Sequence, residues 1–316
     1  MKTEIIASGE SHAELGKFVK SLKTQRQFWL LCIPIIVWVV IFAYYPMYGI
    51  LMAFVDYTPG KEIFQCDFTG IKYFKQFVTN PSILLLLRNT LAMSGLSLTF
   101  GFFSPIVFAL LLNEIGRVKL KKFIQTLSYL PHFISWVVAG SMAYLVLSSD
   151  GILNTLLLSL GFRENSMPFL TKGEYYWTIY TIVNIWKSMG WSSILYLSSM
   201  AGIDEELYQA GSMDGLGRWG MVKHITLPSI APTIILLWIL GIGNILSAGF
   251  DYHLIIGNAA TRPYWDVIDT YSYRYGVQQG YYSMGTAVSL MKSVIGFVLV
   301  CITNFISKKL MDTSIF

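Results

Sequence analysis

Charged side chains are scarce in this sequence. Asp, Glu, Lys and Arg make up 13% of the 316 residues, about half of the roughly 25% that is usual in soluble domains. Apolar residues make up 54%, and the mean hydropathy is +0.54. This balance excludes an ordinary water-soluble enzyme and an intrinsically disordered protein. It predicts an all-α integral membrane protein.

Cysteine is also rare, and the motifs of common enzymes are missing. The three cysteines, Cys32, Cys66 and Cys301, are too scattered for a disulfide framework or a zinc site. Neither Gly-Lys pair, at Gly16 and at Gly60, has the upstream glycine and the following Ser or Thr of an ATP-binding P-loop. The patterns H-E-x-x-H, C-x-x-C and G-x-S-x-G do not occur. The sequence therefore predicts no enzyme activity, no metal site and no cofactor in this chain.

Long apolar runs are plentiful instead. A helix needs about 20 mainly apolar residues to cross roughly 30 Å of hydrocarbon. Six stretches qualify, over residues 28–48, 83–112, 123–147, 176–200, 230–246 and 284–306. We predict a domain of six transmembrane helices over residues 28–312, between a tail of residues 1–27 and a short tail of residues 313–316. Within the first tail, residues 12–26 form either a basic amphipathic helix on the inner membrane surface or a frayed segment.

Lys and Arg are unevenly distributed between alternate loops. The two tails and the loops after the second and fourth stretches carry thirteen of them, and the opposite loops carry seven. Because positively charged loops stay on the cytoplasmic side, the N-terminus and the C-terminus are both expected in the cytoplasm. The net charge of +5 then reflects membrane topology and indicates no nucleic acid partner.

The predicted cytoplasmic loop of residues 204–228 contains a spaced pattern. The run 209–211 is followed after three residues by Gly215, and after nine more by the run 225–228. Asp204 is a suitable N-cap for a short helix with an acidic first turn, and Gly215 is suited to end it. Small residues in this helix leave room for a partner surface. The candidate partner-binding residues are Glu205, Glu206, Tyr208, Gln209, Ala210, Gly211, Asp214, Gly215, Ile225, Leu227 and Pro228.

This pattern resembles the E-A-A-x3-G-x9-I-x-L-P motif of the integral-membrane permease subunits of binding-protein-dependent ABC importers. The spacing is fully matched, although Gln209 replaces the Glu and Gly211 replaces the second Ala. Over roughly residues 25–312 the chain is similar to the LplB-type permeases of oligosaccharides and polysaccharides. The segments that carry this similarity are YYPMYG (44–49), RNT (88–90), ALLLNE (109–114), YLPHFISWVV (129–138), IWKSMGW (185–191), VIDTYSYR (267–274) and residues 283–292.

The resemblance implies the fold and the partners of a type I ABC importer in a bacterial inner membrane. These partners are a second homologous permease, two ATPase subunits that bind ATP and Mg²⁺, an extracytoplasmic solute-binding protein, a sugar substrate and membrane lipid. In this family the short helix of residues 204–228 docks into the ATPase and passes its closure to the spans, which import the sugar by alternating access. The alternative is a secondary transporter or channel that acts without an ATPase.

Three charged residues lie within the predicted spans, and a charge at the centre of a bilayer costs at least about 2.5 kcal/mol. No Asp or Glu lies within a span to neutralise them. Arg88 and Lys292 either snorkel to the surface or face a cavity. Lys187 binds backbone carbonyls or the second permease, or else it contacts substrate. We hypothesise that Lys187 and Lys292 line the translocation path and favour an acidic, uronate-containing sugar. Trp186 and Trp191 either stack on this sugar or pack between helices.

The predicted outer segment of residues 251–282 is dense in tyrosine and tryptophan. Such residues are common where a chain meets the membrane surface, and their rings also stack on sugars, so two interpretations stay open. The same segment carries Asp251, His253, Asp266 and Asp269, whose spacing matches no catalytic site.

Overall fold

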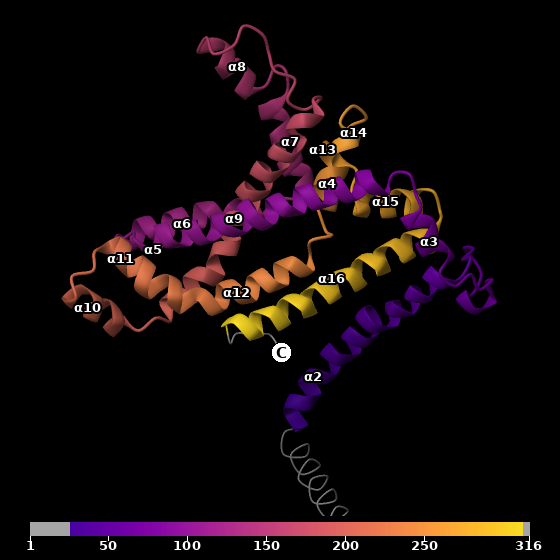
Figure 1. Ribbon diagram of the computed structural model, residues 1–316, viewed down its shortest axis with the longest axis horizontal. Coiled ribbons are helices and arrows are strands. Elements are labelled where there is room, and N and C mark those ends of the chain that lie inside the picture. Colours follow the sequence, from indigo (N-terminus) through magenta and orange to yellow (C-terminus); the bar gives the residue numbers. More distant parts are fainter. Residues whose placement is uncertain (1–25, 312–316) are drawn as a thin grey trace, which may run out of the picture. The chain divides into compact units, whose positions relative to one another are not determined.

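The structure is a computed structural model that describes residues 26–311 (Figure 1). Within these residues the chain is helical apart from its loops and one isolated β-bridge between Val55 and Phe68, which confirms the all-α prediction. The chain divides into two compact units, Met1–Met52 and Ala53–Phe316. The amphipathic helix considered for residues 12–26 lies, except for its last residue, outside the described residues.

The first unit contains an apolar helix. Helix α2 (Arg26–Val39) continues through a π-helical turn, η1 (Val40–Tyr44), into a 3₁₀ helix, η2 (Tyr45–Phe54). The segment Gln27–Phe54 is long and apolar enough to cross a membrane, and its large apolar side chains are exposed. Such a surface is stable only against lipid or against another apolar helix, as expected for the first predicted span.

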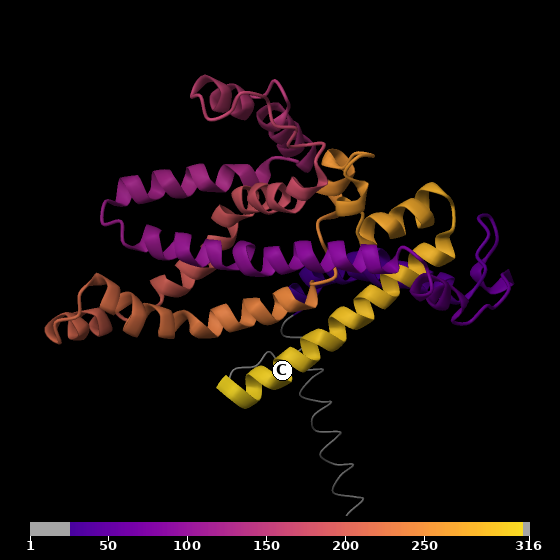
Figure 2. The same ribbon diagram turned by 45° about the horizontal axis from the view of Figure 1, so that its top comes forward.

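Long helices run side by side through the second unit. The first is a continuous helix made of α4 (Ile83–Leu96), the π-helical turn η4 (Ser97–Gly101) and α5 (Phe102–Asn113). The others are α9 (Tyr176–Ala201), α12 (Leu227–Gly243) and α16 (Tyr282–Met311). Both views show α12 alongside α16 (Figures 1 and 2). Pro228 lies where η6 passes into α12, inside the continuous helix Arg218–Gly243, and it has no N–H to donate to the preceding turn.

Shorter helices lie at the two ends of this bundle (Figure 1). One end carries α10 (Glu205–Met213), α11 (Arg218–Met221) and the π-helical turn η6 (Val222–Thr226). The other carries α3 (Lys72–Val78), α13 (Phe250–Ile256), α14 (Arg262–Trp265), α15 (Ile268–Tyr273) and the π-helical turn η7 (Arg274–Gln278). The remaining short elements are η3 (Ile63–Gln65), α8 (Ile152–Ser159) and η5 (Gly173–Tyr175). The 204–228 loop and the aromatic segment are therefore far apart, at opposite ends of the long helices.

Five helices of the described chain are long and apolar enough to span a membrane. They are Gln27–Phe54, Ile83–Asn113, Trp136–Ser159, Arg218–Gly243 and Tyr282–Lys309. Four of these contain all or most of a predicted span. The predicted span over residues 176–200 is helix α9, which has 26 residues but is less apolar than the five. At 1.5 Å per residue it is long enough to cross, and the total of six stays a prediction.

The prediction of one continuous span over residues 123–147 is wrong. The chain breaks at Ile134 and Ser135 into α6 (Val118–Phe133) and α7 (Trp136–Leu147), because both residues have extended backbones. The Ser135 hydroxyl accepts a hydrogen bond of 3.3 Å from the Val138 N–H, so Ser135 is the N-cap of α7. The break leaves the last carbonyls of α6 without partners in their own helix.

Three clusters of buried residues form the core of the second unit. One contains Phe77, Leu86, Tyr271 and Val288, and a second contains Met93, Tyr176, Tyr180, Tyr252 and Val267. The third contains Ile106, Ala109, Tyr196, Met200 and Ile230, and so joins α5, α9 and α12. Because α12 follows the 204–228 loop directly, this third cluster connects that loop to two other long helices.

Candidate functional site

The 204–228 loop, called the coupling loop below, begins with a capped helix. One Asp204 carboxylate oxygen accepts a hydrogen bond of 3.0 Å from the Glu206 N–H, so Asp204 is the N-cap of α10. Glu205 and Glu206 form the acidic first turn, which suits the positive end of a helix. After Met213 the chain turns at Gly215, whose φ of 77° lies in the left-handed region that favours glycine. The predicted short helix and its two ends are thus present.

Two contacts attach α10 to the chain that leads into α12. The Tyr208 hydroxyl lies 3.0 Å from the Thr226 hydroxyl. Gly211 is buried, and a Cβ atom there would lie 2.8 Å from Cδ1 of Ile225 and 3.2 Å from Cδ1 of Leu216. The small residue at position 211 therefore gives close packing within the loop, whereas the sequence analysis expected it to make room for a partner. The spacing of the motif places Ile225 against Gly211.

The opposite side of α10 is exposed. Gln209 and Ala210 are exposed there, as is Asp214 just after the helix. Three large apolar side chains are also exposed at this end of the bundle, namely Leu207 (50%), Met213 (89%) and Trp219 (76%). Exposed apolar residues that are grouped outside the membrane spans mark a surface for another protein. The remaining motif residues, Leu227 and Pro228, lie in the first turn of α12, half-buried and exposed respectively.

Lys187 caps the broken helix α6. Its Nζ donates hydrogen bonds to the backbone carbonyls of Pro131 (3.3 Å), His132 (2.8 Å) and Ile134 (2.6 Å), and the residue is 8% exposed. A cation at the C-terminal end of a helix satisfies the free carbonyls and interacts favourably with the helix dipole. This is the backbone-carbonyl alternative of the sequence analysis, and it occupies all three ammonium protons.

The two tryptophans beside Lys187 face different surroundings. Trp191 stacks on His132, with ring centroids 4.6 Å apart and an angle of 4° between the planes. Trp186 lines an apolar cavity of about 350 Å³ between α7 and α9, together with Ala139, Met142 and Val146. Trp191 thus packs between helices, and neither contact brings the two rings together around one substrate.

We expect Lys187→Met to lower the stability of the protein. The change removes the donor that binds the half-buried carbonyls of Pro131, His132 and Ile134 at the end of α6. The Pro131 carbonyl keeps a hydrogen bond from the Ile134 N–H, and each carbonyl left unsatisfied costs up to about 1–3 kcal/mol. Thermal unfolding in detergent, followed by circular dichroism, should show a lower midpoint, while the KM for uptake stays unchanged. Lys119→Met, which removes an exposed cation from α6, is the control. It should change neither the unfolding midpoint nor the KM for uptake. A raised KM at unchanged stability would instead place Lys187 on the substrate path.

Lys292 has an acidic partner that the sequence analysis missed. Its Nζ forms an ion pair with Asp269 Oδ1, and the two side chains are 22% and 19% exposed. Asp269 lies in α15, outside the predicted spans, so the absence of acids within spans did not leave Lys292 unpaired. The pair joins α15 to α16.

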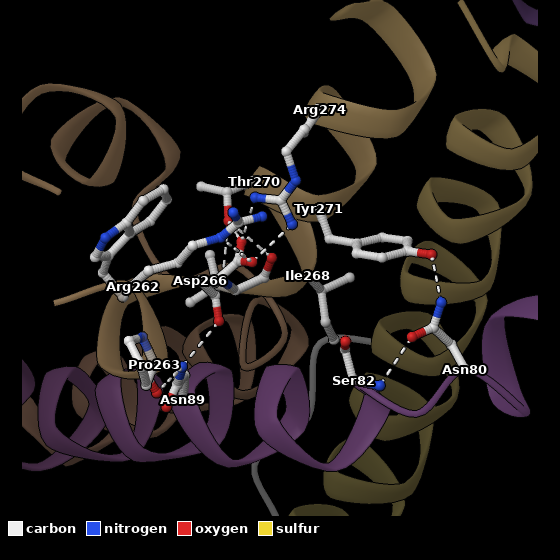
Figure 3. Close-up of polar contacts among 12 residues, drawn as sticks. Asn80, Ser82, Asn89, Arg262, Pro263, Asp266, Ile268, Thr270, Tyr271 and Arg274 are labelled. Carbon is white, nitrogen blue, oxygen red and sulfur yellow. Dashed lines mark hydrogen bonds and ion pairs between the residues drawn. The ribbon is translucent and has the colours of Figure 1, made fainter. Parts of the chain in front are cut away.

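A second polar network holds α14 and α15 on α4 (Figure 3). Asp266 is buried, and its carboxylate accepts hydrogen bonds from Arg274 at 2.6 and 3.1 Å and from the Thr270 hydroxyl at 2.8 Å. The Asn89 amide donates to the backbone carbonyls of Pro263 at 3.1 Å and of Asp266 at 2.9 Å. The Ile268 N–H donates to the Thr90 hydroxyl at 3.1 Å, so the RNT and VIDTYSYR segments are in direct contact.

Arg88 and His253, near this network, also have their partners within this chain. Arg88 donates to the Pro263 carbonyl at 2.6 Å and lies over the rings of Trp177 and Tyr264, so its partners come from this chain. His253 is fully buried between the Tyr176 hydroxyl and the Ala248 carbonyl, and burial lowers its pKa to about 4. This histidine is therefore neutral and structural. No group of His, Cys, Asp and Glu suited to a metal ion occurs in the described part of the chain.

A polar cavity of about 250 Å³ lies at the middle of the α4–α5 helix and of α9. It is lined by Ser94, Ser97, Leu98, Gly101, Phe102, Asn184, Ser188, Gly241, Asn244 and Ser247, and is called the hydroxyl cavity below. Ser94 is 4% exposed, and its hydroxyl has no hydrogen-bond partner in residues 26–311. The π-helical turn η4 begins at its wall, and such turns occur frequently at functional sites. No signal used in the sequence analysis indicated this cavity.

Residues 97–312 match the family of binding-protein-dependent transport system inner membrane components. The chain belongs to this family. It is 41% identical to protein LplB of Bacillus subtilis over 95% of this chain and 94% of that protein. It is also 39% identical to the polygalacturonan/rhamnogalacturonan transport system permease protein YteP of the same organism, over 92% of this chain and 91% of that protein.

A solved structure is similar over nearly the whole permease. It is the crystal structure of a bacterial alginate ABC transporter in complex with an alginate pentasaccharide-bound periplasmic protein, and one of its chains superimposes with a TM-score of 0.84. That chain is 36% identical, and the match covers 94% of this chain and 99% of that one. The comparisons confirm the predicted type I importer fold. They confirm the prediction that the chain is a transport subunit and is not itself an enzyme. They also confirm a multi-pass membrane protein that works with a binding protein and a partner permease.

Proposed function

We propose that this permease forms one half of the path by which an importer takes up an oligosaccharide or polysaccharide fragment. Two observations support the substrate class: YteP is named for polygalacturonan and rhamnogalacturonan, and the structural neighbour is an alginate transporter. The solute-binding protein delivers the sugar from outside the cell, and a second homologous permease forms the other half of the path. Two ATPase subunits in the cytoplasm bind ATP and Mg²⁺ and supply the energy.

The observation that carries this proposal is the construction of the coupling loop. Its apolar side chains Leu207, Met213 and Trp219 are exposed at one end of the bundle. The other side of α10 is fixed to η6 and α12 through the Tyr208–Thr226 and Gly211–Ile225 contacts. A partner that binds the exposed side of α10 can therefore move α12 as well as the loop. Exposed apolar side chains grouped in this way are typical of a surface that binds another protein.

The mechanism follows from how α12 is packed. Closure of the ATPase pair on ATP would shift α10, and the buried residues Val222, Thr226 and Ile230 would transfer the shift to α12. Because α12 packs against α9 and α16, these helices would move with it and open the path toward the loaded binding protein. Release of the products would return the path to its inward-facing state.

The hydroxyl cavity is our candidate for the place where the sugar passes through this subunit. A buried hydroxyl without a partner costs about 1–3 kcal/mol, so the unpaired Ser94 is maintained at a cost in stability. Sugar hydroxyls can supply the missing partner as they pass. Lys187 and Lys292, which the sequence analysis placed on the path, already have partners within the chain. In this proposal the groups of the hydroxyl cavity that contact the sugar in the middle of the membrane are uncharged.

Ser94→Ala tests this assignment. We expect the KM for uptake by the complete importer to rise at least threefold, because one hydrogen bond to the passing sugar is lost. The unfolding midpoint should stay the same or rise, because an unsatisfied buried hydroxyl is removed. Ser104→Ala removes another buried, unpaired hydroxyl that does not line this cavity, and it should change stability alone. Equal KM values for both variants would remove the cavity from the path.

A further inference from the structure

A groove of about 380 Å³ lies between the outer helices and the start of α16. It is lined by Phe250, Asp269, Ser272, Tyr273, Gly276, Val277, Tyr282, Gly285, Thr286 and Ser289, and is called the outer groove below. Its volume lies within the roughly 300–1,000 Å³ of small-molecule sites. Gly276 and Gly285 bring η7 and α16 together at its floor, where a Cβ on Gly276 would lie 2.8 Å from Cα of Gly285.

The lining of the outer groove combines aromatic rings with polar side chains. Phe250 and Tyr273 meet edge to face with centroids 5.1 Å apart, and Tyr282 is a third half-buried ring. In residues 26–311 the hydroxyls of Tyr273 and Tyr282 have no hydrogen-bond partner, and Asp269 Oδ2 has none either. A lipid chain would leave these groups unsatisfied, whereas a sugar offers hydroxyls to them and a C–H face to the rings.

The charge of the groove wall is set by the Asp269–Lys292 pair. Asp269 lines the groove, whereas Lys292 is not among the lining residues and pairs with Asp269 Oδ1. The pair is neutral as a whole, but only its acidic member lines the groove, and Asp269 Oδ2 is left to accept hydrogen bonds. Sugar hydroxyls can donate to this oxygen, whereas a uronate carboxylate would be repelled by it.

We propose that the outer groove is a subsite for one neutral sugar ring, held through hydroxyl donation to Asp269 and through contact with Tyr273 and Tyr282. This inference rests on the proposed import of oligosaccharides and deepens it. Lys292 acts here by holding the Asp269 carboxylate in place through the ion pair, and it does not contact the ring. The subsite selects against a uronate at this position, in contrast to the acidic preference expected from the sequence.

The test uses two probes with the same sugar backbone, which differ in charge and in the ester methyl groups: fully methyl-esterified trigalacturonate and the same trisaccharide as the free acid. Binding to the complete importer in nanodiscs, without binding protein or nucleotide, is measured by saturation-transfer NMR with titration. For the natural sequence we expect the ester to bind at least tenfold more tightly than the acid. Asp269→Asn should reverse this order, because it frees the Lys292 ammonium to meet the carboxylate.

Matched variants separate charge from general damage. Asp269→Asn combined with Lys292→Met should bind the two probes within twofold of each other, because the wall then carries no charge. Tyr273→Leu leaves the ion pair untouched and should weaken both probes at least fivefold at an unchanged ratio, so the proposal can be judged even if Asp269→Asn fails to fold. Lys119→Met removes an exposed cation of α6 that does not line the groove, and it should leave the ratio as it is.

Three results would overturn the proposal: no binding of either probe, tighter binding of the acid to the natural sequence, or a ratio that Asp269→Asn leaves within twofold. The same samples are checked for bound ATPase and for ATP hydrolysis stimulated by loaded binding protein. If these are absent, the proposed function itself fails. If they are present and the ratio is unaffected, only the neutral subsite fails.

Discussion

Replacement of Met213 with Asp is expected to release the ATPase from this permease. Met213 is the last residue of α10 and is 89% exposed, so the change does not disturb the permease itself. If the ATPase docks on α10 as proposed, an apolar side chain at this place is buried against it, and a charge there must be desolvated without a counter-ion. Central contact residues of this kind are worth about 2 kcal/mol or more, which corresponds to roughly thirtyfold in affinity.

The measurement is co-purification of the ATPase subunits through a tag on the permease, together with uptake in cells. Phe68→Asp is the matched control, because Phe68 is also apolar and 79% exposed but lies beside α3 at the opposite end of the bundle. We expect the control to retain the ATPase, and Met213→Asp to lose both the ATPase and uptake. Undiminished ATPase binding by Met213→Asp would mean that the coupling loop docks elsewhere.

The coupling loop could be predicted in detail because its signals are local. The Asp204 cap, the acidic turn and the left-handed Gly215 all act within a few residues, so their spacing determines the helix. The residues that α10 packs against could not be predicted from these local signals. Gly211 contacts Ile225, fourteen positions later, and its small size suggested an external partner when the reason is internal.

The break after α6 was missed because its cause is distant in sequence. Ile134 is apolar and continues the hydrophobic run, so hydropathy gives no sign of an end. The free carbonyls at the break are tolerated because Lys187 binds them from a position more than 50 residues away. Backbone carbonyls are one predicted partner for Lys187, but the sequence does not show which carbonyls these are.

Asp269 shows the same limit for charges. An acid within the membrane is the usual partner of a buried Lys, so a counter-ion in a loop segment was not predicted for Lys292. Asp269 precedes Lys292 by 23 residues and reaches it because η7 and α16 fold back on each other at Gly276 and Gly285. The motif segments RNT and VIDTYSYR were recognised as family features, yet only the fold shows that Asn89 binds the Asp266 carbonyl.

Gly190→Ala is expected to prevent stable folding of the second unit. Helices α6 and α9 cross at this residue, where a Cβ atom would lie 2.5 Å from the Ser128 carbonyl carbon and closer still to its oxygen. Both atoms belong to a helix backbone, which cannot rotate away as a side chain can. The helices must separate, and forced overpacking of this kind typically costs 1–3 kcal/mol or more. Lys187 lies one turn before Gly190, so the same shift pulls its Nζ away from the α6 carbonyls.

The expected result is a strongly reduced amount of permease in the membrane and a lower unfolding midpoint for what remains. Gly95→Ala is the control in another predicted span, since a Cβ there has no atom within 4 Å. It should be neutral or stabilising by up to about 1 kcal/mol, because Ala has the higher helix propensity. Combining Gly190→Ala with Lys187→Met should cost less than the sum of the two changes, because the first already breaks the contacts that the second removes. Full additivity would show that the crossing and the Lys187 cap are independent, and normal stability of Gly190→Ala would show that α6 and α9 do not meet at Gly190.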